Sequence, residues 1–187
     1  MDKFEYKKSL GQNFLKDENI VNKIVDSALI DDDTLVIEIG PGQGAISKLI
    51  VPKAKFTILY EIDNRLEGYL NNLLKDSDNY KIIMNDFLKE DVRSEIQNYD
   101  YKKLYVVANL PYYITTPIVS KFIDDGIFPD KIVVMVQKEV ALRYAAKPNS
   151  RDYGALTVFL NYYYNIKKLF NVDKRCFIPV PGVDSAV

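Results

Sequence analysis

The sequence predicts an α/β protein with a Rossmann-like fold, in which a mostly parallel, seven-stranded sheet is covered by helices on both faces. Three observations predict this fold class. Short apolar runs alternate with segments of helical period, as in chains that build parallel sheets. The runs show little polar alternation, which is typical of strands covered on both faces. A glycine-rich loop joins the first run to a helix, the order found in dinucleotide-binding folds.

The elements follow in order along the chain. A helix is expected over residues 20–29, where apolar residues recur at helical spacing and Asp17 is placed to cap the first turn. A second helical segment is expected at 66–74. Five strands are expected at Leu35–Ile39, Phe56–Tyr60, Tyr80–Met84, Leu104–Ala108 and Ile132–Val136. A sixth strand is expected within 161–170, and a seventh at 183–187 after the Pro-rich turn at 177–182, cut short by the chain end.

Composition excludes several kinds of site. The 187 residues contain no histidine and one cysteine, which excludes Ser-His-Asp catalysis, histidine-ligated metals, an internal disulfide and a Cys-rich zinc site. No apolar run approaches the roughly 20 residues of a membrane span, and the charged N-terminus lacks the apolar core of a secretory signal. We therefore expect a cytoplasmic monomer that binds neither metal nor membrane.

Charge is unevenly distributed along the chain, although the net charge is only -1. Residues 1–16 contain four Lys/Arg and two Asp/Glu, and residues 131–175 contain nine and three. The segment between them, 17–130, contains 12 Lys/Arg and 20 Asp/Glu. Two basic tracts that flank an acidic middle favour a polyanionic partner bound by one face, although chance clustering on solvated faces gives the same pattern.

The glycine-rich loop EIGPGQG ends the first strand and opens a helix. Its glycines, Gly40, Gly42 and Gly44, follow a G-x-G-x-G spacing and not the G-x-G-x-x-G spacing of the NAD fingerprint. Glu61 ends the next strand, where a carboxylate can accept both ribose hydroxyls of an adenosine-type cofactor. Asp86 ends the third strand, where it can accept a hydrogen bond from an adenine amino group. The alternative is a tight structural turn without a ligand.

The tetrapeptide after the fourth strand, Asn109-Leu110-Pro111-Tyr112, is the most informative stretch. A ring amino group is a poor nucleophile because its lone pair is conjugated into the ring. The Asn109 side-chain carbonyl and the Leu110 backbone carbonyl can each accept one of its N–H groups, while Pro111 stiffens the turn. Tyr112 can stack on an extruded base. No general base is required, which agrees with the absence of histidine. The alternative is an Asx-Pro turn with Tyr112 packed in the core.

Taken together, these motifs resemble those of the rRNA adenine dimethyltransferase family, in its KsgA (RsmA) branch. The matching stretches span the chain in the family's order: LGQNFL (10–15), EIGPGQG (38–44), EID (61–63), NDFL (85–88), ANLPYYITTPI (108–118) and FIPVPGVDSAV (177–187). The resemblance implies the class I S-adenosylmethionine-dependent methyltransferase fold. It also implies dimethylation of two adjacent adenosines in the 3′-terminal hairpin of small-subunit rRNA, with the rRNA or the pre-assembled small subunit as partner.

The resemblance also implies roles for individual residues. The expected cofactor-binding residues are Gln12, Asn13, Leu15, Gly40, Gly42, Gly44, Glu61, Ile62, Asp86, Phe87 and Asn109. The expected catalytic residues are Asn109, Leu110, Pro111, Tyr112 and Phe177, with Tyr112 and Phe177 flanking the adenine. From charge and sequence position, the expected RNA-binding residues are Lys7, Lys8, Lys167, Lys168, Lys174 and Arg175.

Two features depart from the family pattern. Asn85 stands where the family usually has glycine, and asparagine tolerates the left-handed backbone expected there. Residues 1–187 are expected to form the methyltransferase catalytic domain, without the helical domain that follows it in family members. Since that domain helps to engage RNA, we expect this chain to bind RNA weakly and to methylate slowly.

Three alternatives remain open. The Erm type of the same family acts on large-subunit rRNA and confers macrolide resistance, but it more often reads Asn-Ile-Pro-Tyr where residues 109–112 here read Asn-Leu-Pro-Tyr. DNA amino-methyltransferases commonly place proline at the position of Leu110. A non-catalytic ribosome-assembly or transcription factor of the same fold is disfavoured by the intact loop, Glu61 and the tetrapeptide.

Overall fold

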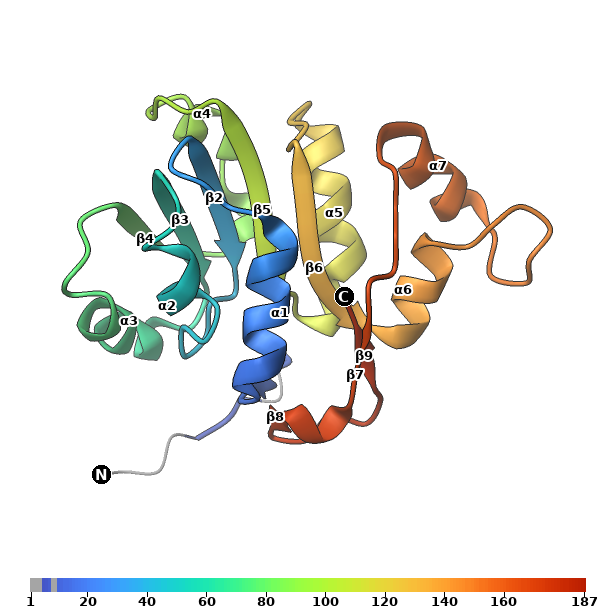
Figure 1. Ribbon diagram of the computed structural model, residues 1–187, viewed down its shortest axis with the longest axis horizontal. Helices are drawn as coiled ribbons and strands as arrows, with labels where there is room; N and C mark the ends of the chain where they lie inside the picture. Colours follow the sequence, from blue (N-terminus) through green and yellow to red (C-terminus); the bar gives the residue numbers. More distant parts are fainter. Residues whose placement is uncertain (1–4, 8–9) are drawn as a thin grey trace.

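A seven-stranded sheet forms the centre of the molecule (Figure 1). The computed structural model describes residues 5–7 and 10–187. Within them the strand order of the sheet is β4-β3-β2-β5-β6-β9-β7. Five strands run parallel: β2 (Thr34–Ile39), β3 (Phe56–Glu61), β4 (Tyr80–Met84), β5 (Lys103–Asn109) and β6 (Lys131–Gln137). They confirm the five strands predicted from the apolar runs, and with them the α/β fold class.

Helices cover both faces of the sheet, as predicted (Figure 1). One face packs against α1 (Glu18–Ala28) and α2 (Ser47–Ile50), and α3 (Glu67–Leu73) leads into Leu74 on the same side. The other face packs against α4 (Val92–Ile96), α5 (Thr115–Asp124), α6 (Lys138–Tyr144) and α7 (Ala155–Tyr163). Every residue of β2 is buried, because this central strand is covered on both sides. The Asp17 carboxylate accepts the backbone N–H groups of Asn19 and Ile20, which confirms the predicted cap of α1.

The C-terminal strands are short and antiparallel. Strand β9 (Ser185–Ala186) lies between β6 and β7 (Asn171–Val172), pairing with each in antiparallel register. The predicted strand at 161–170 is wrong. Helix α7 continues through Tyr163, and the next strand along the chain, β7, begins only at Asn171. The tyrosines suggested a strand, but Leu160 packs into the core from a helical face, and the Asn161 side chain donates to the Thr157 carbonyl one turn earlier.

A second, two-stranded sheet joins the two ends of the chain. Strand β1 (Phe14–Leu15) pairs in antiparallel register with β8 (Phe177–Ile178), so the N-terminal GQNFL motif and the C-terminal FIPVPG motif lie side by side. The Lys16 backbone N–H extends the pairing by donating to the Cys176 carbonyl at 2.9 Å. This small sheet sits at the edge where the parallel strands end (Figure 1).

Strand order reverses at β2, whose neighbours β3 and β5 come from opposite halves of the chain. In open α/β sheets, a crevice forms at the carboxyl ends of the strands where the order reverses. The glycine-rich loop follows β2 and the tetrapeptide follows β5, so the fold brings the two predicted motifs to this crevice.

Candidate active site

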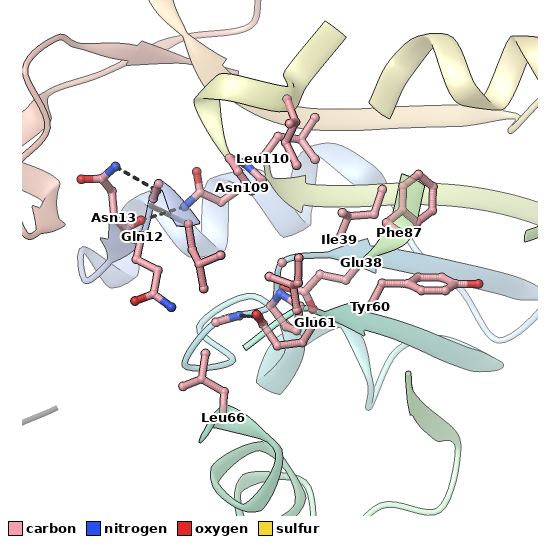
Figure 2. Close-up of a pocket in the computed structure, with 18 of the residues that line it drawn as sticks. Gln12, Asn13, Glu38, Ile39, Tyr60, Glu61, Leu66, Phe87, Asn109 and Leu110 are labelled. Carbon is pink, nitrogen blue, oxygen red and sulfur yellow. Dashed lines mark hydrogen bonds between the residues drawn. The ribbon is translucent and has the colours of Figure 1, made fainter. Parts of the chain in front are cut away.

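A cavity occupies the crevice at the carboxyl ends of β2, β3, β4 and β5 (Figure 2). Its wall contains ten of the eleven predicted cofactor-binding residues: Gln12, Asn13, Leu15, Gly40, Gly42, Glu61, Ile62, Asp86, Phe87 and Asn109. Four predicted catalytic residues also line it: Asn109, Leu110, Pro111 and Tyr112. The fold therefore brings together residues that are about a hundred positions apart in the sequence. Gly44 and Phe177 are the two predicted residues that do not line the cavity.

The glycine loop adopts a conformation that other residues resist. Gly40, Gly42 and Gly44 have φ angles of 69°, 59° and 69°, in the left-handed region that favours glycine. A Cβ atom on Gly42 would stand 2.5 Å from Cε1 of Phe14, so a side chain there would displace the β1 segment. A Cβ atom on Gly44 would stand 2.4 Å from Cδ2 of Leu73, on the side away from the cavity. The structure thus places Gly44 in packing between the loop and α3, and not in the cavity wall.

Glu61 ends β3 with a buried carboxylate that faces the loop (Figure 2). Its Oε2 accepts the Gly42 backbone N–H at 3.0 Å, and its Oε1 accepts the Asp63 N–H at 2.9 Å. Burial raises the pKa of this carboxyl above its ordinary value, while the two backbone donors oppose the rise. A carboxylate oxygen accepts more than one hydrogen bond, so each oxygen keeps capacity for a hydroxyl donor in the cavity.

Glu38 is a second buried carboxyl in the cavity wall, and the sequence reasoning did not single it out. Burial raises its pKa to about 8, although the Ser47 hydroxyl donates to its Oε2 at 2.6 Å. The proximity of Glu61 raises the pKa of Glu38 further. A charged residue inside the otherwise apolar run TLVIEI was the signal that could have identified it, because an unpaired buried carboxylate is costly.

A polar cluster around Asp63 holds the N-terminal segment over the cavity. The Gln12 Nε2 donates to Asp63 Oδ2 at 2.7 Å, and the Lys7 backbone N–H donates to Gln12 Oε1 at 2.7 Å. Arg65 binds the same carboxylate, and this contact, more than any other, keeps the pKa of Asp63 well below its usual range. Lys7 Nζ lies 3.6 Å from Asp63 Oδ1. Gln12 and Lys7 therefore close one rim of the cavity through Asp63.

Asn109 and Asn13 are coupled directly. The Asn109 Nδ2 donates to the Asn13 backbone carbonyl at 3.1 Å, and the Asn13 Nδ2 donates to the Gly11 carbonyl at 3.1 Å (Figure 2). The bond to Asn13 fixes the orientation of the Asn109 amide. Within the described part of the chain, no protein group donates a hydrogen bond to its Oδ1. The Leu110 backbone N–H donates to the Met135 carbonyl of β6 at 3.1 Å, which anchors the turn after β5.

Tyr112 and Tyr113 take different positions after this turn. The Tyr112 ring lines the cavity and its hydroxyl lies 2.5 Å from Ser185 Oγ on β9. Burial raises the pKa of Tyr112. Tyr113 is exposed, with its ring beside Gly11, where a Cβ atom would stand 3.0 Å from Cδ1 of Tyr113. Adenine stacking by Tyr112 stays a prediction, with the ring in a suitable place.

Asp86 and its neighbours form the third side of the cavity. Asp86 Oδ1 accepts the Leu88 backbone N–H at 3.1 Å, and Phe87 turns inward to pack edge-on against Tyr60. The φ angle of Asn85 is not positive, so the left-handed backbone that asparagine could tolerate there does not occur. Asparagine replaces the family's glycine at this position without backbone strain.

Phe177 is fully buried and lies outside the cavity wall. It pairs with Leu15 across the β1–β8 ladder and belongs to the core on the α1 side of the sheet. The structure thus does not place Phe177 in the cavity wall, and its role beside the adenine stays a prediction. The sequence showed an aromatic beside a Pro-rich turn, whereas its burial depends on the distant partner strand.

The predicted RNA-binding residues separate into two groups. Lys174 lies in η5 (Lys174–Cys176) with Arg175, directly before β8 and therefore on the cavity side. The other group, Lys167 and Lys168, lines a different cavity of about 710 Å³ with residues 128–131 at the opposite end of β6. Lys167 and Lys168 therefore lie away from the mouth of the candidate active site, and the basic tract 131–175 is not gathered on one side of the sheet. Lys8 lies outside the described residues.

Among residues 5–7 and 10–187, no helix is long and apolar enough to cross a membrane. The same residues contain no group of three or more His, Cys, Asp or Glu side chains placed to hold a metal ion.

Comparison with known proteins identifies the family. A sequence model described as ribosomal RNA adenine dimethylase matches residues 3–187. The chain belongs to the ribosomal RNA adenine dimethylase family. The resemblance drawn from the motifs is thereby confirmed, and the fold is that of the class I S-adenosylmethionine-dependent methyltransferases.

Individual relatives place the chain more finely within that family. The ribosomal RNA small subunit methyltransferase A of Streptococcus pneumoniae strain D39 is 49% identical over 186 residues, covering 98% of this chain. This chain spans 64% of the length of that relative. Among solved structures, a dimethyladenosine transferase from Plasmodium falciparum has a TM-score of 0.80 at 30% identity, covering 92% of this chain and 61% of that one. The 23S rRNA methyltransferase ErmE has a TM-score of 0.78 at 29% identity, covering 93% and 67%.

Proposed function

We propose that this chain is the catalytic domain of an rRNA adenine dimethyltransferase. Its substrates would be two adjacent adenosines in the 3′-terminal hairpin of small-subunit rRNA, methylated on their exocyclic amino groups. The single observation that carries the proposal is the Asn109 amide, fixed by the Asn13 carbonyl at 3.1 Å with its Oδ1 left to accept a hydrogen bond. A protein of this kind would act in the cytoplasm, as a monomer, on the assembled small subunit.

The cavity fits S-adenosylmethionine, which when bound supplies an electrophilic methyl group. Two features support the fit. Gly40 and Gly42 carry no side chain, so the backbone at these two positions can approach a ligand closely. Glu61 presents a buried carboxylate with acceptor capacity for a ribose diol, and Asp86 lies at the next strand end for an adenine amino group. Asn13, Leu15 and Phe87 would complete the walls.

The reacting amino group would be handled by the tetrapeptide. Asn109 Oδ1 and the Leu110 carbonyl would accept its two N–H groups, which directs the nitrogen lone pair out of the ring conjugation. Tyr112 would hold the extruded base by stacking. The ring amino group needs no base before methylation, since it becomes acidic once a fourth substituent is added. This agrees with a chain that has no histidine.

Sequence similarity favours small-subunit rRNA over large-subunit rRNA as the substrate. The dimethyladenosine transferase and ErmE structures have nearly equal TM-scores, 0.80 and 0.78, so the fold alone does not decide against the Erm-type alternative. The 49% identity to a small-subunit methyltransferase exceeds the 29% identity to ErmE. The Asn-Leu-Pro-Tyr tetrapeptide at 109–112 supports the same choice.

The test is transfer of tritiated methyl groups from S-adenosylmethionine to purified ribosomal subunits from cells that lack the modification. Small subunits should be labelled, and digestion should yield dimethyladenosine from two adjacent positions near the 3′ end. Large subunits and 23S rRNA serve as the matched control and should remain unlabelled. Label confined to 23S rRNA would support the Erm-type alternative, and cofactor binding without any transfer would support a non-catalytic assembly factor.

A further inference from the structure

We propose that Ser185 is a positioning residue for methyl transfer, which holds the Tyr112 ring in the orientation that stacks on the target base. The proposal rests on the proposed function. The observation behind it is the hydrogen bond of 2.5 Å between the Tyr112 hydroxyl and Ser185 Oγ. This bond connects the tetrapeptide loop to the VDSAV motif, 73 positions along the chain.

Ser185 is a rigid anchor for that hydroxyl. Its side chain is fully buried, and its backbone lies in the central sheet between two neighbouring strands. It pairs with Gln137 of β6 on one side and with Val172 of β7 on the other. A serine hydroxyl on an exposed loop would move with the loop, whereas this one is fixed by two strand pairings.

The backbone end of Tyr112 is fixed as well. Pro111 precedes it with φ of -58°, and the Thr115 hydroxyl donates to the Pro111 carbonyl at 3.2 Å. With both ends of the side chain held, the ring has little freedom to tilt. A stacking surface that is ordered before the base arrives avoids the entropy cost of ordering it during binding.

The chemistry of Tyr112 points to the same conclusion. Burial raises the pKa of its hydroxyl, so the phenol stays protonated at neutral pH and is unsuited to act as a base. Ser185 itself is fully buried, contacts Tyr112 at the phenol hydroxyl and does not line the cavity, so it would not touch the base. The hydroxyl pair would therefore contribute through ring orientation alone.

The experiment compares Ser185→Ala, Tyr112→Phe and the double variant. Single-turnover methylation of small subunits gives the rate, and a 3′-terminal hairpin with 2-aminopurine at the target position reports stacking through fluorescence quenching. Each single variant should slow transfer about tenfold, or about 1.4 kcal/mol of barrier, and should reduce the quenching. The double variant should be no slower than either single one, because both remove the same hydrogen bond. Cofactor affinity should not change.

Tyr144→Phe is the matched control. The Tyr144 hydroxyl makes a similar bond to Thr116 Oγ1, at 2.9 Å, but Tyr144 does not line the candidate active site. This variant should keep the wild-type rate and quenching. It shows whether losing any hydrogen bond of a buried tyrosine hydroxyl slows transfer, or only the bond between Tyr112 and Ser185. Thermal unfolding of all four variants, compared with wild type, shows whether each folds.

Three outcomes would overturn the proposal. The first is a folded Ser185→Ala variant with wild-type rate and quenching. The second is additive slowing in the double variant, which would show that Ser185 acts independently of Tyr112. If Ser185→Ala fails to fold, Tyr112→Phe alone decides, and an unchanged rate and quenching would be the third. If the wild type quenched the probe but transferred no methyl group, the proposed function would fail, while the quenching difference would still decide the role of Ser185.

Discussion

Replacing Glu61 by alanine should affect cofactor binding and folding stability separately. The carboxylate accepts the Gly42 N–H at 3.0 Å and the Asp63 N–H at 2.9 Å, in a site where Glu61 is only 5% exposed. Its remaining acceptor capacity faces the cavity and would bind the ribose hydroxyls of the cofactor. The variant removes both sets of bonds at once.

The magnitudes follow from those bonds. Hydrogen bonds to a charged group contribute about 1.5–3 kcal/mol, so losing the ribose contacts should weaken S-adenosylmethionine binding by about 2–3 kcal/mol, or about 30- to 150-fold in Kd. The two orphaned backbone donors should lower the free energy of unfolding by about 1–3 kcal/mol each where water does not replace the carboxylate. Part of this loss is offset, because the raised pKa of Glu61 shows that burying its charge is itself unfavourable.

Titration calorimetry well below the unfolding temperature measures the first effect, and denaturant unfolding without cofactor measures the second. Glu67→Ala is a suitable control, because this glutamate lies in the first turn of α3, exposed and outside the cavity wall. It should leave the Kd unchanged. A folded Glu61→Ala variant with wild-type affinity would refute the ribose assignment, whatever its stability.

Three further predictions test other parts of the site. Asn109→Ala should slow single-turnover methylation at least about 100-fold, far more than it weakens RNA binding, and should weaken cofactor binding less than Glu61→Ala does; a surviving rate within a factor of about three would exclude the assigned role. Glu38 has a folded-state pKa of about 8 against 4.5 when unperturbed, so its folded state binds the proton more tightly and stability should fall as pH rises through that interval. Glu38→Gln should flatten this fall in unfolding temperature, and an unchanged pH profile would contradict the argument. Lys174→Gln should weaken RNA binding and reduce the slope of its salt dependence by the equivalent of about one phosphate contact. Lys167→Gln, at the other end of β6, should leave RNA affinity and its salt dependence unchanged. Equal effects of the two variants would contradict the assignment of Lys174, and not Lys167, to the RNA-binding side.

The five parallel strands and most residues of the cavity wall could be predicted from the amino-acid sequence alone. Strands covered on both faces are apolar with little alternation, and the largely buried β2, β3 and β5 can be recognised from such runs without knowledge of their partners. The half-buried β4, at the edge of the sheet, and the partly buried β6 have apolar runs of similar length. Parallel strands end at one edge, so the order Gly loop, Glu61, Asp86 and Asn109 already indicated that these residues meet. The absence of histidine limited the chemistry before any geometry was known.

Features that depend on pairing between distant segments could not be predicted from the sequence. Phe177 is buried because β8 pairs with β1 at the other end of the chain, and Tyr112 is anchored because β9 inserts between β6 and β7. Residues 161–163 of the predicted strand belong instead to α7, where the Asn161 side chain donates to the Tyr144 carbonyl of α6. Such outcomes depend on contacts between residues far apart in the chain, and local periodicity carries information only about neighbours within a few positions.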